Sequence, residues 1–374
     1  MGIGYDALVV HYSEIFLKGP QVKRHFEQIL MQRIWQKLQW EGFSDFQLSI
    51  KDHSLWVYGQ ISLEMAPVIA KVFGVRYVTA VLTSFSSLSA VKESAKQLSC
   101  LANSEDSLTF RIKAKKEKGL STATKTFEIE ASDFFSFWKL NLNDPDIVIH
   151  INIKKKYSNI GYLRFEGPGG LPYGSSGKVL ALVSKGIDSA VAAWLISKRG
   201  CETILLHFGE ESIDSIAHQI SISAGKTIKI IHISHVPFLQ LLKSNHAGKY
   251  LCILCKMGML YAAQHYCEIT GSKAIVTGEN LGQVASQTLD NLSAMTQVFS
   301  YPILRPLLTY DKESIVDLAK IIGTYNIYAN PSCSFVPSHP STSVSYEKLN
   351  ELIKSDTFQH CLNEWKKTWR YYES

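Results

Sequence analysis

The sequence predicts an α/β protein in which two small α+β layers precede a larger, doubly wound parallel sheet. Beyond residue 178, short apolar strands alternate with helices, which is typical of a parallel sheet covered on both faces. Before that point, strands and helices follow the order of a small α+β layer. A run rich in Gly and Pro at 167–174 separates the two patterns. At 374 residues the chain is also too long for one ordinary core.

The front of the chain is expected to hold two domains. In residues 1–61, a strand at 7–11, a helix and strands at 46–50 and 54–58 predict a ferredoxin-like layer. The helix follows Pro20, and its apolar face carries Phe26, Ile29, Leu30, Ile34 and Leu38. A second α+β domain is expected at 62–166, with strands near 108–114 and 147–153, and residues 167–177 are expected to form a linker.

The back of the chain is expected to form a single doubly wound domain at 178–345. Its strands are predicted at 179–183, 203–208, 229–233 and 274–277, each short and apolar as buried parallel strands are. Helices are expected to begin near Asp188, Ile213, Lys256 and Gly282. The tail, 346–374, reads as one or two helices.

Composition and charge narrow the class of protein. Hydrophobic residues at 46% and charged residues at 19% are typical of a globular chain, and no apolar run reaches the roughly 18 residues of a membrane helix. The N-terminus has no charged-then-apolar export signal, so we expect a cytoplasmic protein with no membrane partner. In a reducing compartment its seven cysteines are poor candidates for disulfides.

Two basic clusters lie in the front half, although the net charge is only +6. Each has an aromatic residue beside it, Phe110 or Tyr157. Clustered cations are either a solvated face or a contact for nucleic-acid phosphates, and both interpretations stay open here. The residues are Arg111, Lys113, Lys115, Lys116, Lys154, Lys155 and Lys156.

The strand at 179–183 leads directly into Ser-Lys-Gly-Ile-Asp-Ser at 184–189, and a helix follows. A tight turn of small residues at a helix N-terminus points backbone N–H groups outward, where the helix dipole favours an anion. The loop is too short for the Walker pattern and lacks its Lys-Ser/Thr ending. It resembles Ser-Gly-Gly-x-Asp-Ser, the PP-loop of enzymes that split ATP into AMP and pyrophosphate.

Further motifs extend this resemblance along the chain. Residues 277–288, Thr-Gly-Glu-Asn-Leu-Gly-Gln-Val-Ala-Ser-Gln-Thr, match the long signature of the tRNA 4-thiouridine synthetase (ThiI) family except at Asn280. The stretches 12–19, 169–178 and 304–307 are similar to other motifs of this family and follow one another in the family's order. Residues 110–116 and 144–146 resemble its RNA-binding THUMP domain.

The resemblance implies an ATP site around the loop. The implied ATP contacts are Leu182, Val183, Ser184, Gly186, Asp188, Ser189, His207, Phe208, Lys256, Gly278 and Gln287. It also implies that Asp188 acts on Mg²⁺ and the leaving pyrophosphate, and that Lys312 stabilises charge on the reacting phosphate. Lys18, in the opening motif, joins the basic clusters as an RNA-binding candidate.

Cys252 and Cys255 form a C-x₂-C at an expected helix entrance, which brings both sulfurs to one side. Cys333 aligns with the cysteine that many family members use for persulfide chemistry. Archaeal-type members, which this chain resembles, use all three positions as ligands of an iron–sulfur cluster, either [4Fe–4S] or [3Fe–4S]. Zinc and thiol-only or persulfide chemistry remain alternatives, although no convincing fourth zinc ligand is evident.

The implied activity is the ATP-dependent replacement of O4 of a tRNA uridine, at position 8, by sulfur. The chain leaves no room for the rhodanese domain of some relatives, so sulfur is expected from an external donor, either sulfide or a carrier protein. A homodimer stays open, and for part of the family the resemblance extends to thiamine biosynthesis.

One departure supports a rival interpretation. Lys185 stands where the family has glycine, and a lysine could block the loop or strain it. The rival is a non-catalytic tRNA-binding paralogue. A THUMP-containing RNA methyltransferase is disfavoured by the loop and by the 277–288 signature.

Overall fold

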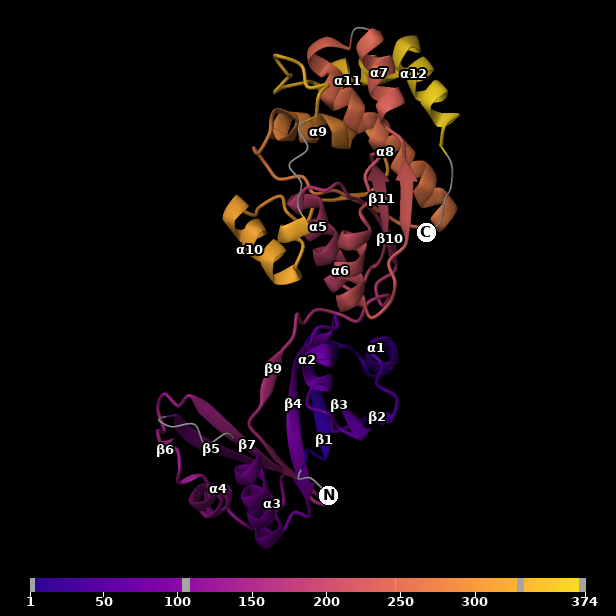
Figure 1. The fold of residues 1–374 in the computed structure, drawn as a ribbon. Coiled ribbons are helices and arrows are strands. Elements are labelled where there is room, and N and C mark those ends of the chain that lie inside the picture. The colour runs from indigo at the N-terminus through magenta and orange to yellow at the C-terminus, as the bar shows by residue number, and fades with distance from the viewer. Residues whose placement is uncertain (1–3, 103–107, 246, 328–332, 370–374) are drawn as a thin grey trace. The chain divides into compact units, whose positions relative to one another are not determined.

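The computed structural model describes residues 4–102, 108–245, 247–327 and 333–369, and Figure 1 draws its fold. The chain divides into two compact units, 1–170 and 171–374, and each is described by itself. The division falls inside the predicted linker at 167–177.

The first half of the N-terminal unit is the predicted ferredoxin-like layer. Its antiparallel strands lie in the order β2-β3-β1-β4 and two helices pack on them. The buried face of α1 carries Phe26, Leu30, Ile34 and Leu38, as its spacing predicts. The elements are β1 (Ala7–Tyr12), α1 (Pro20–Trp40), β2 (Phe46–Lys51), β3 (Ser54–Gly59), α2 (Met65–Ala70) and β4 (Val75–Ser84).

Strand β4 belongs to both halves of this unit. It pairs with β1 over most of its length and with β8 at its far end, so one nine-stranded sheet runs through both α+β layers. The expected boundary between residues 61 and 62 precedes α2 and β4, both of which pack in the ferredoxin-like layer. The remaining elements are α3 (Leu88–Leu101), β5 (Thr109–Lys116), α4 (Thr124–Ser132), β6 (Lys139–Leu140), β7 (Ile147–Ile153), β8 (Ser158–Gly161) and β9 (Arg164–Glu166).

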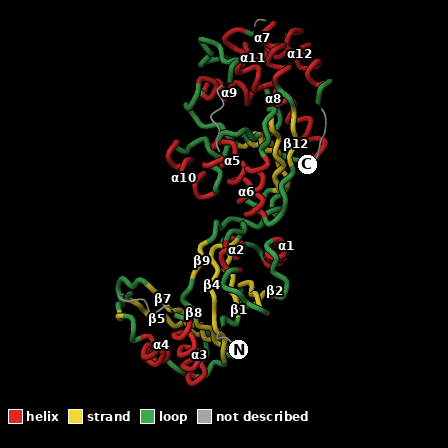
Figure 2. The backbone as a smooth tube through the Cα atoms, viewed as in Figure 1, coloured by secondary structure: helices red, strands yellow, loops and turns green. Residues whose placement is uncertain are grey.

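Helices α3 and α4 lie side by side on one face of the second layer (Figure 2). Beneath them the sheet buries Phe110, Ile112, Ile149 and Ile151. Because side chains alternate along a strand, the residues between these apolar ones face the opposite side of the sheet. The sheet therefore presents a polar face on that side.

The C-terminal unit is the predicted doubly wound domain. Its five parallel strands lie in the order β12-β11-β10-β13-β14, so the direction of winding reverses between β10 and β13. Ligands bind at such a switch point, at the carboxyl ends of the strands. The strands are β10 (Lys178–Leu182), β11 (Glu202–Phe208), β12 (Ile230–Ile233), β13 (Ile275–Val276) and β14 (Ile303–Leu304).

Two helical layers cover this sheet. Helix α5 contacts both α6 and α10, whereas α7 and α8 pack together with the C-terminal helices. The expected helix start at Gly282 is wrong, because a 3₁₀ turn, η4 (Ala285–Gln287), precedes a helix that begins at Leu289. The helices are α5 (Ile187–Lys198), α6 (Asp214–Ala224), α7 (Val236–Ser244), α8 (Leu251–Thr270), α9 (Leu289–Val298) and α10 (Lys312–Ile322).

The tail forms two helices, α11 (Tyr346–Lys354) and α12 (Asp356–Lys366), as expected, and residues 370–374 lie outside the described ranges. Leu349, Phe358 and Trp365 belong to the same buried core as α7 and α8. The tail is therefore an integral part of the C-terminal unit. No helix in the described part of the chain is long and apolar enough to cross a membrane.

Candidate ATP site, cysteine pair and basic cavity

The loop after β10 is held closed by two serines. The hydroxyl of Ser189, in the first turn of α5, lies 3.0 Å from the amide nitrogen of Ser184 and 3.1 Å from the carbonyl oxygens of Ser184 and Gly186. The Gly186 N–H in turn donates to the Ser184 hydroxyl at 3.2 Å. These bonds fix the backbone of the loop at the N-terminus of α5, where an anion is favoured.

Gly278 brings the neighbouring strand end against this loop. A Cβ atom at this position would lie 2.7 Å from both the backbone nitrogen and Cα of Ser189. Only glycine permits so close an approach, so the 277–279 segment and the start of α5 form two walls of one site.

A cavity of about 290 Å³ opens at these strand ends. All the expected ATP contacts except His207 line it. They are Leu182, Val183, Ser184, Gly186, Asp188, Ser189, Phe208, Lys256, Gly278 and Gln287, and Met259, Leu260, Thr277 and Glu279 complete the lining.

His207 lies outside this lining, and its Nδ1 is 2.7 Å from the carbonyl oxygen of Val183. Burial lowers the pKa of its ring, so the imidazole is uncharged at neutral pH. Its role here is to support the end of β10 from behind.

Asp188 and Lys312 are brought together from distant parts of the sequence. The Lys312 ammonium lies 2.7 and 3.0 Å from the two carboxylate oxygens of Asp188, and the Gln283 amide donates to one of them at 3.1 Å. Both residues predicted to act on the phosphates therefore meet at the mouth of the loop, with Gln283 as a third member that sequence reasoning missed.

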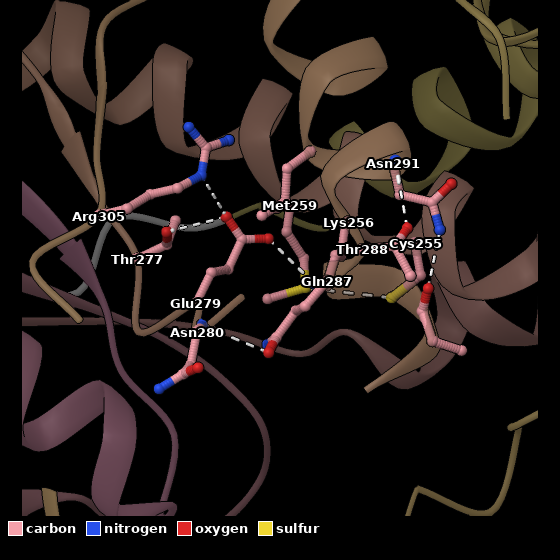
Figure 3. Close-up of polar contacts among 12 residues, drawn as sticks. Cys255, Lys256, Met259, Thr277, Glu279, Asn280, Gln287, Thr288, Asn291 and Arg305 are labelled. Carbon is pink, nitrogen blue, oxygen red and sulfur yellow. Dashed lines mark hydrogen bonds and ion pairs between the residues drawn. The ribbon is translucent and has the colours of Figure 1, made fainter. Parts of the chain in front are cut away.

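Glu279 is the buried charge of the site (Figure 3). Its carboxylate accepts hydrogen bonds from Lys256 at 2.9 Å, Arg305 at 2.8 Å and Thr277 at 3.1 Å. Burial alone would raise the pKa of Glu279, but the two cations outweigh burial and hold the pKa below its ordinary value. Glu279 therefore stays ionised and fixes Lys256 in the cavity wall.

Sequence reasoning did not assign Glu279 or Arg305 to the site. Each follows one of two neighbouring parallel strands, β13 and β14, so their side chains emerge at the same edge of the sheet. The opposite charges of Glu279 and Arg305 are visible in the sequence. The sequence does not show that they meet, because β13 and β14 have only two residues each.

Lys185 does not distort the loop. Its ammonium pairs with Glu211 at 2.9 Å. In the described ranges, only Asp52 and His53 among non-glycine residues have positive φ, so Lys185 occupies its position without backbone strain.

The cysteine pair lies in the first turn of α8, immediately before Lys256. Burial, followed by the charge of a Cys333 thiolate, raises the pKa of both Cys252 and Cys255, that of Cys255 to about 12. The three sulfurs thus lie within electrostatic reach of one another. Within the described ranges, however, no three His, Cys, Asp or Glu side chains converge closely enough to hold a metal ion. Pro331 and Ser332, which precede Cys333, lie outside those ranges.

In the N-terminal unit, part of the expected basic clusters gathers around a second cavity. This hollow of about 370 Å³ lies on the polar face of the nine-stranded sheet. Lys115 and Lys154 line it, together with three basic residues that sequence reasoning missed, His11, His150 and Arg164. Aromatic rings also line it, and the Arg164 guanidinium lies 3.8 Å from the centre of the Tyr77 ring.

Burial and the neighbouring cations lower the pKa of both histidines in this cavity. Burial, followed by the nearby Arg164, His150 and Arg76, lowers the pKa of His11 to about 4. Burial, followed by Lys115, Lys113 and Arg164, lowers the pKa of His150. The lining therefore combines three charged cations, Lys115, Lys154 and Arg164, with one carboxylate, Asp52, a balance that suits phosphate groups.

The other expected RNA contacts are dispersed. Lys116 donates to the carbonyl oxygens of Leu120 and Thr122, and Arg111 donates to that of Leu142. Lys113 and Lys155 are exposed, Lys156 lines a separate hollow, and Lys18 is exposed with its ammonium 6.0 Å from the Phe26 ring.

Comparison with known families matches both units. A family model described as thiamine biosynthesis protein (ThiI) matches residues 174–358, and one described as the ThiI ferredoxin-like domain matches residues 7–79. The probable tRNA sulfurtransferase of Methanothermobacter thermautotrophicus is 33% identical, with 94% of each chain covered. That of Methanocaldococcus jannaschii is also 33% identical, over 92% of this chain and 96% of its own.

Solved structures agree with this fold. A crystal structure of a 4-thiouridine synthetase–RNA complex with bound ATP matches with a TM-score of 0.86, 26% identity and 99% of both chains covered. PH1313 from Pyrococcus horikoshii matches with a TM-score of 0.65 and 20% identity, over 85% of this chain and 99% of its own, and shows the fold alone. Because both family models match and the relatives are 33% identical over more than nine-tenths of the chain, the chain belongs to the ThiI family of tRNA sulfurtransferases.

Proposed function

We propose that this chain is an ATP-dependent tRNA sulfurtransferase that replaces O4 of a uridine by sulfur and so makes 4-thiouridine. By family resemblance the target is uridine 8. The observation that carries the proposal is the cavity in which the phosphate loop, Asp188, Lys312 and the wall held by Glu279 come together. The names of the relatives and the ATP and RNA of the similar crystal structure support it.

In the first step, O4 of the uridine attacks the α-phosphorus of ATP. An O4–P bond forms, the bond to the β-phosphate oxygen breaks, and pyrophosphate leaves. The closed loop leaves the N-terminus of α5, with its dipole and the backbone N–H groups of its first turn, at the cavity for the leaving pyrophosphate. Because the Ser184–Ser189 bonds already fix these donors, no reorganisation is needed as charge develops.

Asp188 is the residue that would hold Mg²⁺. In such sites Mg²⁺ is commonly bound by a protein carboxylate together with the phosphates of the substrate. Asp188 lines the cavity beside the loop and can supply that carboxylate. When bound, the ion supplies positive charge to the phosphates. Lys312, beside Asp188, adds a second positive charge at the same edge of the cavity.

In the second step, a sulfur nucleophile attacks C4 of the adenylated uridine, and AMP leaves with the original O4. Cys252 and Cys255 lie next to Lys256, Met259 and Leu260 of α8, which line the ATP cavity. The sulfur site is therefore proposed beside the nucleotide.

By family resemblance, Cys252, Cys255 and Cys333 would hold an iron–sulfur cluster, [4Fe–4S] or [3Fe–4S], because thiolates are the protein ligands of such clusters. Such a cluster supplies, when bound, an iron that can carry sulfide. Zinc bound by these thiols and a persulfide at Cys333 are the alternatives, and the exposed Cys333 is accessible to a sulfur carrier.

The N-terminal unit is proposed to hold tRNA by its backbone, mainly at the cavity lined by Lys115, Lys154 and Arg164. We further propose an external sulfur donor, sulfide or a carrier protein, and a cytoplasmic location with the tRNA pool. An undistorted loop around Lys185 supports catalysis over the rival, a non-catalytic tRNA binder.

Asp188→Ala tests the ATP site. We expect 4-thiouridine formation, measured by mass spectrometry of digested tRNA after incubation with ATP and sulfide, to disappear while tRNA affinity is retained. Asp317→Ala is the matched control, because Asp317 is an exposed carboxylate of α10 paired with Lys320. Undiminished 4-thiouridine from Asp188→Ala would refute the assignment.

Cysteine variants test the sulfur site. Cys252→Ser, Cys255→Ser and Cys333→Ser should each lose thiolation and visible absorption yet still release pyrophosphate, whereas Cys100→Ser, an exposed cysteine elsewhere, should behave as wild type. Full activity in a colourless, iron-free preparation would reject the cluster. If only Cys333→Ser were inactive, persulfide chemistry at Cys333 would replace it.

A further inference from the structure

A histidine that no motif pointed to lies against the cysteine pair. The Nε2 atom of His235 is 3.1 Å from the Sγ atom of Cys255. His235 is the N-cap residue of α7, and the contact therefore joins the starts of α7 and α8.

The His235 ring packs in a cluster with two aromatic residues. The Phe208 ring, which lines the ATP cavity, lies 6.0 Å away, and that of Trp365 lies 6.3 Å away, measured between ring centroids. Trp365 is fully buried, and its indole N–H donates to the carbonyl oxygen of Ser234 at 2.7 Å, one residue before His235. The ring thus has a fixed position behind the cavity wall, with Nε2 directed at Cys255.

A sulfur in this position requires a hydrogen-bond donor when it is charged. Cys255 packs against the apolar core of the unit, which disfavours its thiolate. Side chains that donate a hydrogen bond to a ligating group orient it and strengthen its binding, and the His235 ring at 3.1 Å meets this requirement in the tautomer that carries its proton on Nε2.

We infer that His235 is a positioning residue that donates its Nε2 proton to the Cys255 thiolate and so fixes this sulfur for its work in the sulfur site. The inference rests on the proposed function in one respect, namely that Cys255 belongs to that site. His235 is not among the residues that line the cavity, so this role needs no contact with ATP.

Two substitutions separate the hydrogen bond from packing. His235→Phe keeps a ring against Phe208 and Trp365 but loses the donor. His235→Gln loses the ring but keeps an N–H near the position of Nε2. Retained ATP affinity in both, measured by calorimetric titration, shows that each variant is folded.

The first measurement uses the metal-free, reduced protein. Alkylation by iodoacetamide is followed by peptide mass spectrometry at Cys255, with Cys252 as the internal reference. We expect alkylation of Cys255 to be about tenfold slower in His235→Phe, because a hydrogen bond to a charged group is lost, and to be restored in His235→Gln. Equal rates in wild type and His235→Phe, or equal slowing in both variants, would overturn the inference.

The second measurement uses protein reconstituted anaerobically with iron and sulfide. Loss of a donor to a ligand should lower iron affinity against a chelator about 10- to 100-fold in His235→Phe and change the midpoint potential, with both restored in His235→Gln. Wild-type protein that takes up no iron would refute the proposed cluster, while the alkylation rates would still decide the role of His235. An unchanged affinity and potential in His235→Phe that does take up iron would count against the inference.

Discussion

Replacing Glu279 by Gln removes the negative charge that two cations share. The carboxylate is nearly buried, with its side chain 11% exposed, and it bonds Lys256 at 2.9 Å and Arg305 at 2.8 Å. Breaking a buried ion pair costs about 3–5 kcal/mol, and because Lys256 is 24% exposed we expect the lower end, about 3 kcal/mol. For a unit of roughly 200 residues this lowers the melting temperature by about 6 to 12 °C.

The assay is differential scanning calorimetry of the full chain, with ATP added to identify the transition of the C-terminal unit. Glu211→Gln is the matched control, because Glu211 pairs with Lys185 at 2.9 Å but is 59% exposed, so its loss should cost about 1 kcal/mol at most.

The effect of Glu279→Gln should also depend on pH. The folded-state pKa of Glu279 lies below its ordinary value of 4.5, so its stabilisation is present above that value and is lost as pH falls through the folded-state pKa. The two proteins should therefore converge in acid. A melting temperature for Glu279→Gln within 2 °C of wild type at pH 7 (about 0.5–1 kcal/mol) would refute the reasoning.

Gly278→Ala places a methyl group 2.7 Å from the Ser189 backbone, so ATP affinity, measured by calorimetric titration, should fall about tenfold or more. Gly19→Ala is the control, because a methyl group there enters open space and should leave the affinity unchanged. Wild-type affinity in Gly278→Ala would contradict the close approach. Lys185→Gly should leave the rate of AMP formation within about a factor of three, because Glu211 already holds the ammonium, and AMP formation by that variant alone would make the natural chain the non-catalytic binder. Lys115→Ala should reduce the slope of log K against log salt concentration for tRNA binding by about 1. Lys92→Ala should not change this slope, because Lys92 is paired with Glu130. Equal slopes in wild type and Lys115→Ala would remove Lys115 from the interface. The pKa values of His11 and His150 lie below the ordinary value, so both rings are neutral at pH 7. Bound phosphate would raise these pKa values, so the affinity for tRNA should rise as pH falls from 7 to 5. The rise should be smaller in a His11→Asn, His150→Asn double variant.

The C-terminal unit was largely predictable because buried parallel strands read as short apolar runs, and four of its five strands were found in this way. Strand β14 was missed because Ile303–Leu304 offers only two residues. The meeting of Glu279 and Arg305 depends on that strand, so it could not be predicted. The helix expected at Gly282 failed for a different reason, since its true N-cap is Thr288, whose hydroxyl accepts from the Asn291 N–H.

The basic face was less predictable, because linear clustering does not follow the pleat of a strand. Arg111, Lys113 and Lys115 alternate with apolar residues, whereas Lys116 turns to the 120–122 loop. His11, His150 and Arg164 come from three strands that are distant in sequence, and only sheet pairing places them together. The contact of His235 with Cys255 likewise depends on the fold, because it joins the starts of two successive helices.

The packing of α12 has a consequence for the order of events during synthesis. The Trp365 ring stacks on Phe238 at 4.5 Å, and its indole N–H bonds the backbone before α7. The core under the ATP cavity is thus completed only when residues far downstream of the phosphate loop have left the ribosome. The N-terminal unit contains its whole sheet within residues 1–170, so it can fold first and present its polar face while the catalytic half is still being made. A nascent chain cut short before α12 would then bind RNA without consuming ATP.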